Sequence, residues 1–319
     1  MNLEFENELA EIEERIAELS KLDSTEYPQL NKDLGTLRRK MRSLTKKIYE
    51  NLSPWDTVRI ARHPDRPLFR DFIDGMCSEF IELHGDRRFG DDKALIGGFA
   101  TIDKHRVMLI GMVKGRTVDE KVHHNFGMPN PEGYRKAMRL MKLAEKYGLP
   151  IVCMVDTPAA YPGREAEERG QAEAIARNLT EMANLEVPII VVITGEGGSG
   201  GALGIAVGDT IMMLRYAVYS VIPPEGCAAI LWRDAEMAPQ AADALKITAE
   251  SLLELGIIDE IIDEPAGGAH RDPETTIART REAIIAALQR LKRQSPNRLR
   301  DSRYTKFAKM GRVKKARAQ

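Results

Sequence analysis

Hydrophobic and polar positions divide the chain into three parts with different periods. In residues 1–52, apolar side chains recur every three or four positions along two segments, which predicts two amphipathic helices. The first segment is acidic and the second is basic, so we expect an antiparallel helical hairpin. Residues 53–293 alternate short apolar runs with amphipathic stretches, which predicts an α/β domain. Residues 294–319 are basic and poor in apolar side chains, and we expect a frayed, solvated tail.

The local period of the apolar positions predicts the elements of the α/β domain. Residues 94–102 and 107–113 flank four polar residues and are expected to form a β-hairpin. Residues 54–67 are rich in proline and charge and are expected to be an irregular link. Further strands are expected at residues 151–155, 188–194, 210–214, 219–222 and 257–262. Helices are expected from residue 224 and at residues 69–83, 133–147, 165–184, 202–207, 241–246, 249–255 and 273–291.

A glycine-rich segment follows the uninterrupted apolar run at residues 188–194. Five of the seven residues at positions 195–201 are glycine, so the backbone there can approach another group closely. The predicted order is strand, glycine loop and helix, which leaves backbone N–H groups at the start of the helix without partners inside the helix. The segment therefore predicts an anion site built from backbone amides.

Two nucleotide-binding interpretations of this segment can be tested on the sequence. A P-loop is excluded because no Gly-Lys-Ser or Gly-Lys-Thr follows the glycines. Gly195, Gly197 and Gly200 match the dinucleotide fingerprint G-x-G-x-x-G. That fingerprint also needs an acidic residue at the end of the next strand, and the strands that follow carry Arg215 and Ser220 instead. The dinucleotide interpretation is therefore disfavoured.

A serine hydrolase is another interpretation of the same segment. Ser199 lies in the G-x-S-x-G pattern of a nucleophile elbow. Asp259 or Asp263, followed by His270, has the chain order of the remaining triad residues. The doubled glycines around the serine differ from the single glycines of an elbow, which weakens the match.

An oxyanion hole formed by the backbone amides of Gly200 and Gly201 is the third kind of site. Consecutive glycines favour it, because they expose consecutive N–H groups without any side chain in the way. A purely structural role, in which the glycines only permit tight packing of strand against helix, stays open beside it.

Basic residues end the predicted strand at residues 107–113 and are candidates for a phosphate contact. Lys114 and Arg116 both lie at this strand end, where a bound ligand could meet them. The alternative is that both side chains are solvated.

Composition narrows the class of protein. The net charge is −1, with 47 basic and 48 acidic residues, so no overall field favours nucleic acid or a membrane surface. The three cysteines lack zinc-ligand spacing, and His123 and His124 have no carboxylate at helical spacing, so metal binding is not expected. The first residues lack a secretion signal, and no apolar run approaches the roughly 20 residues that span a bilayer. We therefore expect a cytoplasmic protein.

Four motifs, in a fixed order, carry a family resemblance. They are Asp-Thr-Pro-Ala-Ala-Tyr-Pro-Gly at 156–163, Glu-Glu-Arg-Gly-Gln at 167–171, Gly-Glu-Gly-Gly-Ser-Gly-Gly at 195–201 and Pro-Glu-Gly-Cys at 224–227. Together they resemble the carboxyltransferase α subunits of bacterial acetyl-CoA carboxylase. The resemblance extends from the N-terminal helices to about residue 291.

The resemblance implies a crotonase-like fold, which is a spiral of β-β-α units. It implies transfer of a carboxyl group from carboxybiotin to acetyl-CoA, giving malonyl-CoA for fatty acid synthesis. The implied partners are a carboxyltransferase β subunit in an α2β2 assembly, a biotin carboxyl carrier protein and a biotin carboxylase. No cofactor is expected to be bound permanently by this chain, and any zinc is expected on the β subunit.

The resemblance also implies roles for residues of the matching motifs. The amides of Gly200 and Gly201 would stabilise charge on the ureido oxygen of biotin, and Lys114 and Arg116 become candidates for the CoA phosphates. The biotin pocket is expected to involve Pro158, Tyr161, Gly163, Gly197 and Gly198.

Two residues depart from the family's usual sequence. Ala159 stands where glycine is usual, and alanine would be strained there if the position required a positive φ. Pro223 stands where serine is usual, which removes a hydroxyl group and a backbone donor.

Overall fold

A mixed eight-stranded sheet forms the centre of the computed structural model, which describes residues 3–22, 27 and 29–311. The strand order is β1-β2-β3-β4-β5-β6-β8, and β7 pairs with the end of β5. Strands β1, β2 and β3 are antiparallel, and the remaining pairs are parallel. The strands are β1 (Cys77–Glu82), β2 (Leu95–Ile102), β3 (His105–Met112), β4 (Ile151–Thr157), β5 (Ile189–Gly198), β6 (Thr210–Leu214), β7 (Val218–Ser220) and β8 (Glu260–Ile262).

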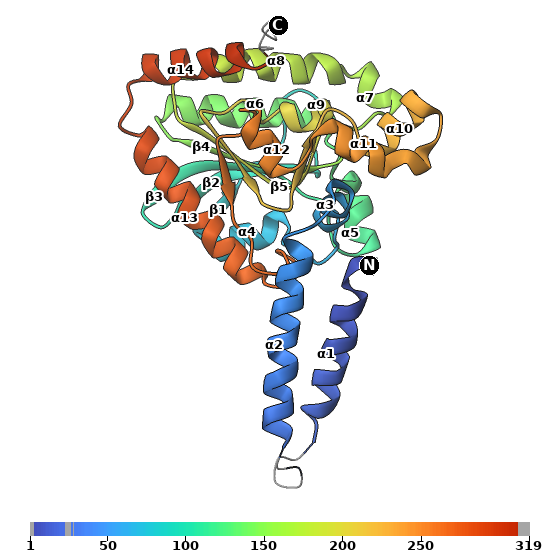
Figure 1. Ribbon diagram of the computed structural model, residues 1–319. Coiled ribbons are helices and arrows are strands. Elements are labelled where there is room, and N and C mark those ends of the chain that lie inside the picture. The colour runs from blue at the N-terminus through green and yellow to red at the C-terminus, as the bar shows by residue number, and fades with distance from the viewer. Residues whose placement is uncertain (1–2, 23–26, 28, 312–319) are drawn as a thin grey trace, which may run out of the picture.

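Helices cover both faces of this sheet, as Figure 1 shows. Helices α6 (Pro131–Lys146) and α8 (Gln171–Asn184) lie over one face, and α4 (Phe69–Met76) and α13 (Pro273–Leu291) lie over the other. Because both faces are covered, β4, β5 and β6 are buried along almost their whole length and do not alternate between buried and exposed residues. The other helices of the body are α3 (Pro54–Ala61), α5 (Val118–His123), α7 (Arg164–Glu168), α9 (Ser199–Leu203), α10 (Pro224–Trp232), α11 (Ala238–Leu245), α12 (Ala249–Glu254) and α14 (Pro296–Lys309).

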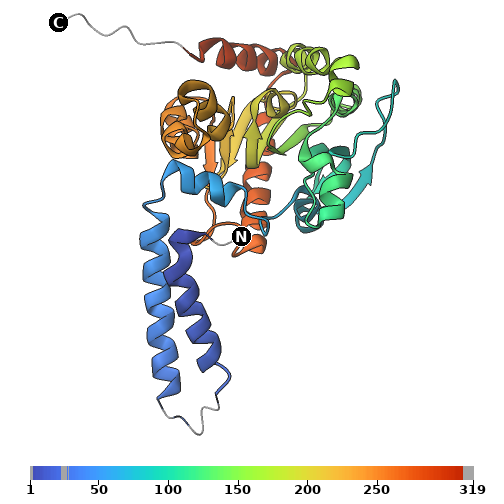
Figure 2. The same ribbon diagram turned by 90° about the vertical axis from the view of Figure 1, so that its right-hand side faces the viewer.

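The predicted helical hairpin is confirmed. Helices α1 (Asn7–Leu19) and α2 (Leu30–Tyr49) run antiparallel and project from the body as an arm (Figures 1 and 2). At the base of the arm, the Tyr49 hydroxyl donates to Glu6 over 2.5 Å, and Arg271 of the body donates to the same carboxylate over 3.1 Å. The acidic and basic helices share one exposed ion pair, Lys40–Glu8 at 3.5 Å.

The β2–β3 hairpin, strands β4, β5, β6 and β8, and helices α6, α10, α11, α12 and α13 all lie where the sequence predicts them. The segment 54–67 is not an irregular link throughout. The Ser53 side chain accepts a hydrogen bond from the N–H of Asp56, and Pro54 occupies the first helical position of α3. The predicted helix at residues 69–83 is also wrong in its second half, where β1 adds an antiparallel strand to the sheet edge.

Two helix boundaries near the glycine-rich segment differ from prediction. The helix expected at residues 165–184 is divided into α7 and α8 at Gly170, whose φ of +84° is incompatible with a continuing helix. The helix expected at residues 202–207 is α9, which starts at Ser199 and ends at Leu203.

The C-terminal segment is not frayed where the structure describes it. Residues Pro296–Lys309 form α14, which packs beside α8. The Arg303 side chain is 1% exposed and donates to the carbonyls of Met182, Leu185 and Val187 and to both carboxylate oxygens of Asp209. This ion pair and these carbonyl contacts attach α14 to the end of α8, because the last carbonyls of a helix otherwise lack partners. Residues 312–319 of the predicted tail lie outside the described residues.

Candidate active site

The glycine-rich segment begins in a strand with a two-residue bulge. Val155 of β4 pairs with Ile193 of β5, but the next pair is Thr157 with Gly197, so β5 has two more residues than β4 in this interval. Beyond the bulge, residues 196–198 pair with β7, whereas residues 190–193 pair with β6. A bulge bends a strand and redirects the residues that follow it. The predicted loop is therefore a redirected strand end that leads directly into α9.

Close packing explains most of the glycines in this segment. A Cβ atom on Gly198 would lie 1.9 Å from the carbonyl oxygen of Pro158, and one on Gly201 would lie 2.3 Å from the backbone nitrogen of Ala160. No side chain fits at such distances from backbone atoms. The structural role that the sequence left open is therefore real at these two positions.

Gly200 is different. A Cβ atom built on Gly200 would meet only the side chain of Ile175, at 3.7 and 3.8 Å, which is ordinary van der Waals contact. The described residues thus provide no steric reason for a glycine at this position. A group that approaches from outside the chain would provide one, because a missing side chain leaves the backbone N–H accessible.

Helix α9 exposes unpaired amides beside Gly200. The first N–H groups of a helix have no partner within it, and no side chain of the described residues caps the start of α9. These N–H groups belong to Ser199, Gly200 and Gly201. The helix has only five residues, so we attribute any anion affinity to these individual donors and not to a helix dipole.

The structure places three of the five predicted biotin-pocket residues together. Pro158, Gly197 and Gly198 line one small cleft, together with Pro223 and Pro224. Tyr161 and Gly163 are not among the residues that line this cleft. The N–H of Tyr161 donates to the carbonyl of Pro129 over 3.0 Å, and its ring covers Gly163, where a Cβ atom would lie 2.3 Å from the ring.

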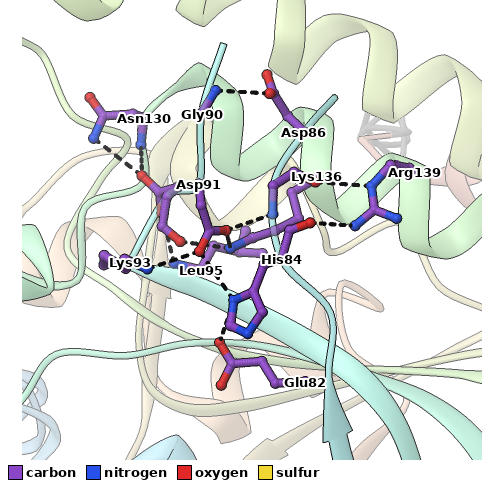
Figure 3. A network of polar contacts seen from close by, with 12 residues as sticks. Glu82, His84, Asp86, Gly90, Asp91, Lys93, Leu95, Asn130, Lys136 and Arg139 are labelled. Atoms are coloured by element: carbon purple, nitrogen blue, oxygen red, sulfur yellow. Dashed lines mark hydrogen bonds and ion pairs between the residues drawn. The ribbon is translucent and has the colours of Figure 1, made fainter. Parts of the chain in front are cut away.

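A polar cluster that includes Asp91, Asn130 and Lys136 lies at the start of α6 (Figure 3). The fully buried Lys136 donates to a carboxylate oxygen of Asp91 over 2.5 Å and to the carbonyl of Asp92 over 2.6 Å. The Asp92 side chain in turn accepts from the backbone N–H of Asn130 over 2.9 Å. The cluster fixes the start of α6 and, through Pro129, the segment that carries Tyr161.

An apolar groove lies beside the start of α9. It has a volume of about 330 Å³ and combines residues of α9, β7, α11 and α12. Its lining residues include Ser199, Leu203, Tyr219, Val221 and Leu255. Three of these side chains, Leu203, Val221 and Leu255, are exposed large hydrophobic groups.

An ion cluster lies at the β5 bulge, with its centre at Glu196, Lys114 and Asp156 largely buried and its Glu225 end partly exposed. Glu196 accepts hydrogen bonds from Arg62 over 2.7 Å and from Lys114 over 2.8 Å. Lys114 also pairs with Asp156 at 2.7 Å, and Arg62 donates to Glu225 over 2.5 Å. Burial of the Glu196 carboxyl group raises its pKa, but the charges of Lys114 and Arg62 outweigh burial and lower the pKa to about 2.

These contacts bear on the two predicted phosphate ligands. Lys114 is enclosed between Asp156 and Glu196, and burial, which lowers its pKa, is outweighed by these two carboxylates, which raise it. Arg116 points elsewhere and makes a bidentate pair with Asp71, at 3.0 and 2.8 Å. Both cations therefore have carboxylate partners within this chain, and their contact with a CoA phosphate stays a prediction.

The residues of the hydrolase interpretation are not brought together as a triad. Asp259 accepts from the N–H of Ile211 over 2.7 Å and from Lys306 over 2.8 Å, and Asp263 pairs with Arg215. The His270 ring stacks on His63 at a centroid distance of 4.2 Å, and within the described residues neither ring nitrogen of His270 has a hydrogen-bond partner. No acid therefore orients this histidine.

The structure also bears on metal binding and on Ala159 and Pro223, the two residues that depart from the family's usual sequence. Across the described ranges, no group of three or more His, Cys, Asp or Glu side chains is placed to hold a metal ion. Ala159 is not among the residues with positive φ, so alanine causes no such strain there. Pro223 directly precedes α10, at φ −59° and ψ 143°, which a proline adopts without strain.

None of the described helices is both long and apolar enough to cross a membrane.

The sequence analysis missed the ion cluster. Its members are separated by up to 163 residues, from Arg62 to Glu225, and no local pattern connects them. A signal was present in two places. Glu196 is the charged residue inside the glycine segment, and Asp156 directly follows the apolar run at residues 151–155. A carboxylate in such a buried setting needs a partner of opposite charge.

Comparison with known proteins identifies the family of the chain. The profile of a family described as "Acetyl co-enzyme A carboxylase carboxyltransferase-like" matches residues 2–311. Relatives from Geobacter metallireducens and Halorhodospira halophila are 56% and 53% identical, and each alignment covers 97% of both chains. Both relatives are named acetyl-coenzyme A carboxylase carboxyl transferase subunit alpha.

Solved structures share the fold at low sequence identity. The transcarboxylase 12S structure has a TM-score of 0.59 at 19% identity, covering 82% of this chain and 46% of that one. The beta subunit of P. aeruginosa geranyl-CoA carboxylase has a TM-score of 0.56 at 17% identity, covering 77% of this chain and 46% of that one. The predicted crotonase-like fold is thereby confirmed, and the serine hydrolase interpretation is not supported. The chain belongs to the acetyl-CoA carboxylase carboxyltransferase family, to which its α-subunit relatives also belong.

Proposed function

We propose that this chain is the α half of a carboxyltransferase that moves a carboxyl group from carboxybiotin to acetyl-CoA, giving malonyl-CoA. The observation that carries the proposal is the set of uncapped amides at the start of α9, beside the sterically open Gly200. The names of the relatives supply the substrate class, and the geometry supplies the place where it would react.

The proposed task of the α9 amides is to stabilise developing negative charge. Carboxybiotin, delivered by its carrier protein, supplies an activated carboxyl group whose departure leaves charge on the ureido oxygen. The N–H groups of Gly200 and Gly201 would donate to that oxygen, because fixed donors need no reorganisation as the charge appears. Pro158, Gly197 and Gly198 would form the wall beside the ring, and Tyr161 and Gly163 would hold the outer end of the same segment.

The site needs a second chain in this proposal. Acetyl-CoA must also lose a proton and carry charge on its carbonyl oxygen, which requires a second set of donors. The described residues offer one such set, so we assign the second to the β subunit of an α2β2 assembly, together with any zinc. The carrier protein and a biotin carboxylase complete the proposed partners, and the free thiols of Cys77, Cys153 and Cys227 suit a reducing cytoplasm.

An exposed apolar surface beside the site supports this assembly. Val221 is 73% exposed, and Ile230 and Leu231 of the neighbouring helix α10 are 72% and 63% exposed. Exposed apolar patches of this kind mark protein interfaces. Val221 also lines the groove beside α9, so a partner that covered it would enclose the site.

The test is reconstitution with candidate β subunits. The purified pair should decarboxylate malonyl-CoA in the presence of biocytin as carboxyl acceptor, and neither chain alone should do so. Absence of activity from every copurified pair would contradict the proposal. Labelling of Ser199 by a fluorophosphonate would favour the hydrolase interpretation instead.

A further inference from the structure

We propose that Glu196 is a positioning residue for carboxyl transfer, acting with Lys114, Asp156 and Arg62 to hold the bulged end of β5. The inference rests on the proposed function, since it concerns the same site. Glu196 does not donate to the substrate in this proposal. It positions the N–H groups at the start of α9 through the backbone between residues 196 and 200.

The first step in the argument is where the cluster attaches. The backbone N–H of Glu196 donates to a carboxylate oxygen of Asp156 over 2.9 Å, at the point where the register of β5 against β4 is interrupted. On the preceding residues of the bulge, Arg66 donates to the carbonyl of Thr194 over 2.9 Å. A bulge leaves backbone groups without ladder partners, and these side chains replace those partners.

The second step is how many elements the cluster joins. Arg62 follows α3, Lys114 follows β3, Asp156 lies in β4, Glu196 in β5 and Glu225 in α10. All five are held by contacts of 2.5 to 2.9 Å. The strand end that leads into α9 is therefore fixed from the elements around it, and α10, which carries the exposed apolar surface, is fixed to the same point.

The third step is the charge balance. Two cations, Arg62 and Lys114, face three carboxylates, those of Asp156, Glu196 and Glu225. Removing the Glu196 charge leaves two of each sign, so a Glu196→Gln variant loses geometry without leaving an unpaired buried charge. Removing Lys114 takes away the cation that lies between Asp156 and Glu196, so these two carboxylates then face each other with Arg62 as the remaining cation.

A matched control exists at the other end of the same strand. Asp209 accepts from the N–H of Ile189, the first residue of β5, over 2.7 Å and pairs with the buried Arg303 at 2.8 Å. This pair anchors β5 as the Glu196 cluster does, but far along the strand from residue 200. An Asp209→Asn variant therefore weakens the fold without touching the bulge.

The experiment uses the full chain in complex with its β subunit, assayed with malonyl-CoA and biocytin. Glu196→Gln should lower kcat by about 10- to 100-fold with KM for malonyl-CoA nearly unchanged, because misplacing reacting groups by about 1 Å has effects of that size. Asp209→Asn should lower the thermal midpoint and leave kcat within about twofold. Equal loss of kcat in both variants would show a general stability effect and overturn the inference, as would a wild-type kcat in Glu196→Gln.

A double-mutant cycle provides a second readout. In Lys114→Met, the carboxylates of Asp156 and Glu196 lose the cation between them, so their repulsion should displace the bulge and lower kcat. The double variant Lys114→Met/Glu196→Gln removes this repulsion, so its loss of kcat should be smaller than the product of the two single losses. A wild-type kcat in Lys114→Met, or single losses that simply multiply in the double variant, overturns the inference. An inactive wild-type pair instead contradicts the proposed function, so the two failures are distinguishable.

Discussion

Gly200 and its neighbours show what single residues contribute to the site. Positions 198 and 201 require glycine, because a Cβ there would lie less than 2.5 Å from backbone atoms of another segment. Gly200, in contrast, has room for a side chain. Substitution at Gly201 therefore tests packing, and substitution at Gly200 tests the proposed ligand.

Gly200→Pro and Gly200→Ala separate the donor from the side chain. Proline is tolerated in the first turn of a helix and removes the N–H, while alanine adds a methyl group and keeps the N–H. We expect Gly200→Pro to lose about 100- to 1000-fold in kcat and Gly200→Ala to lose much less, measured as biocytin-dependent decarboxylation by the complex. Copurification with the β subunit checks that both variants fold. Equal activity of the two variants would contradict a donor role for this amide.

Ser199 has a left-handed backbone conformation, which is usually occupied by glycine. Its φ is +53°, a conformation that is unfavourable for residues other than glycine by about 1 kcal/mol or more. Ser199→Gly should therefore be more stable than Ser199→Ala by about 1 kcal/mol in urea unfolding. Both variants should retain carboxyl transfer, since the hydroxyl has no role in the proposed chemistry. Loss of activity in both would return the serine to consideration as a nucleophile.

At the scale of elements, a histidine pair between two segments of the chain makes the stability of the fold depend on pH. His270, in the loop between β8 and α13, stacks on His63, which follows α3. Burial lowers the pKa of His270 to about 3, and the nearby charges of His63, Arg66 and Arg271 act in the same direction. The histidine is therefore neutral in the folded state at pH values where it is protonated in the unfolded chain.

This difference predicts acid sensitivity. Because the folded pKa lies below the unfolded value near 6.5, the unfolded state binds more protons between about pH 6.5 and pH 3, and stability falls as pH falls through that range. His270→Phe keeps the stacked ring without a titrating group, so its loss of unfolding free energy between pH 7.5 and pH 5 should be smaller than that of wild type. Urea titrations at both pH values measure this change in the free energy of unfolding. An identical loss in the two proteins would show that His270 does not titrate in this range.

At the scale of the whole molecule, the exposed apolar side chains of Val221 and of helix α10 form the proposed contact with the partner. The arm of α1 and α2 projects away from the body, and α14 covers α8. We expect the surface of Val221, Ile230 and Leu231 to face the β subunit, because that contact would enclose the groove beside α9.

Leu231→Asp should therefore prevent copurification with the β subunit and abolish carboxyl transfer, while the thermal midpoint of the chain alone stays unchanged. Tyr304→Asp is the matched control, since Tyr304 is 70% exposed on α14 and lies outside this surface. It should leave both complex and activity intact. A Leu231→Asp chain that still forms an active complex would exclude this surface as the interface.

Prediction from the sequence succeeded where the signal was local. Helix α13 was predicted with both of its ends, because Pro273 starts it and its apolar period continues to Leu291. Strand β5 was recognised from its β-branched run, and the glycine segment was recognised from composition. Prediction failed where a local signal was weak or ambiguous, as at β1, whose residues fit a helical period as well as a strand.

The sequence by itself determined the family, the hairpin and the buried strands, and it predicted where the site lies. Only the tertiary structure decided that the glycine segment is a bulged strand end, that Gly198 and Gly201 are packing residues while Gly200 is open, and that Lys114 pairs with Glu196 and Asp156. It also decided that the basic segment at Pro296–Lys309 is a packed helix anchored by Arg303. The reason is physical. Periodicity and glycine content act over a few neighbouring residues, whereas steric fit and the pairing of buried charges depend on partners that are distant in the chain and close only after folding.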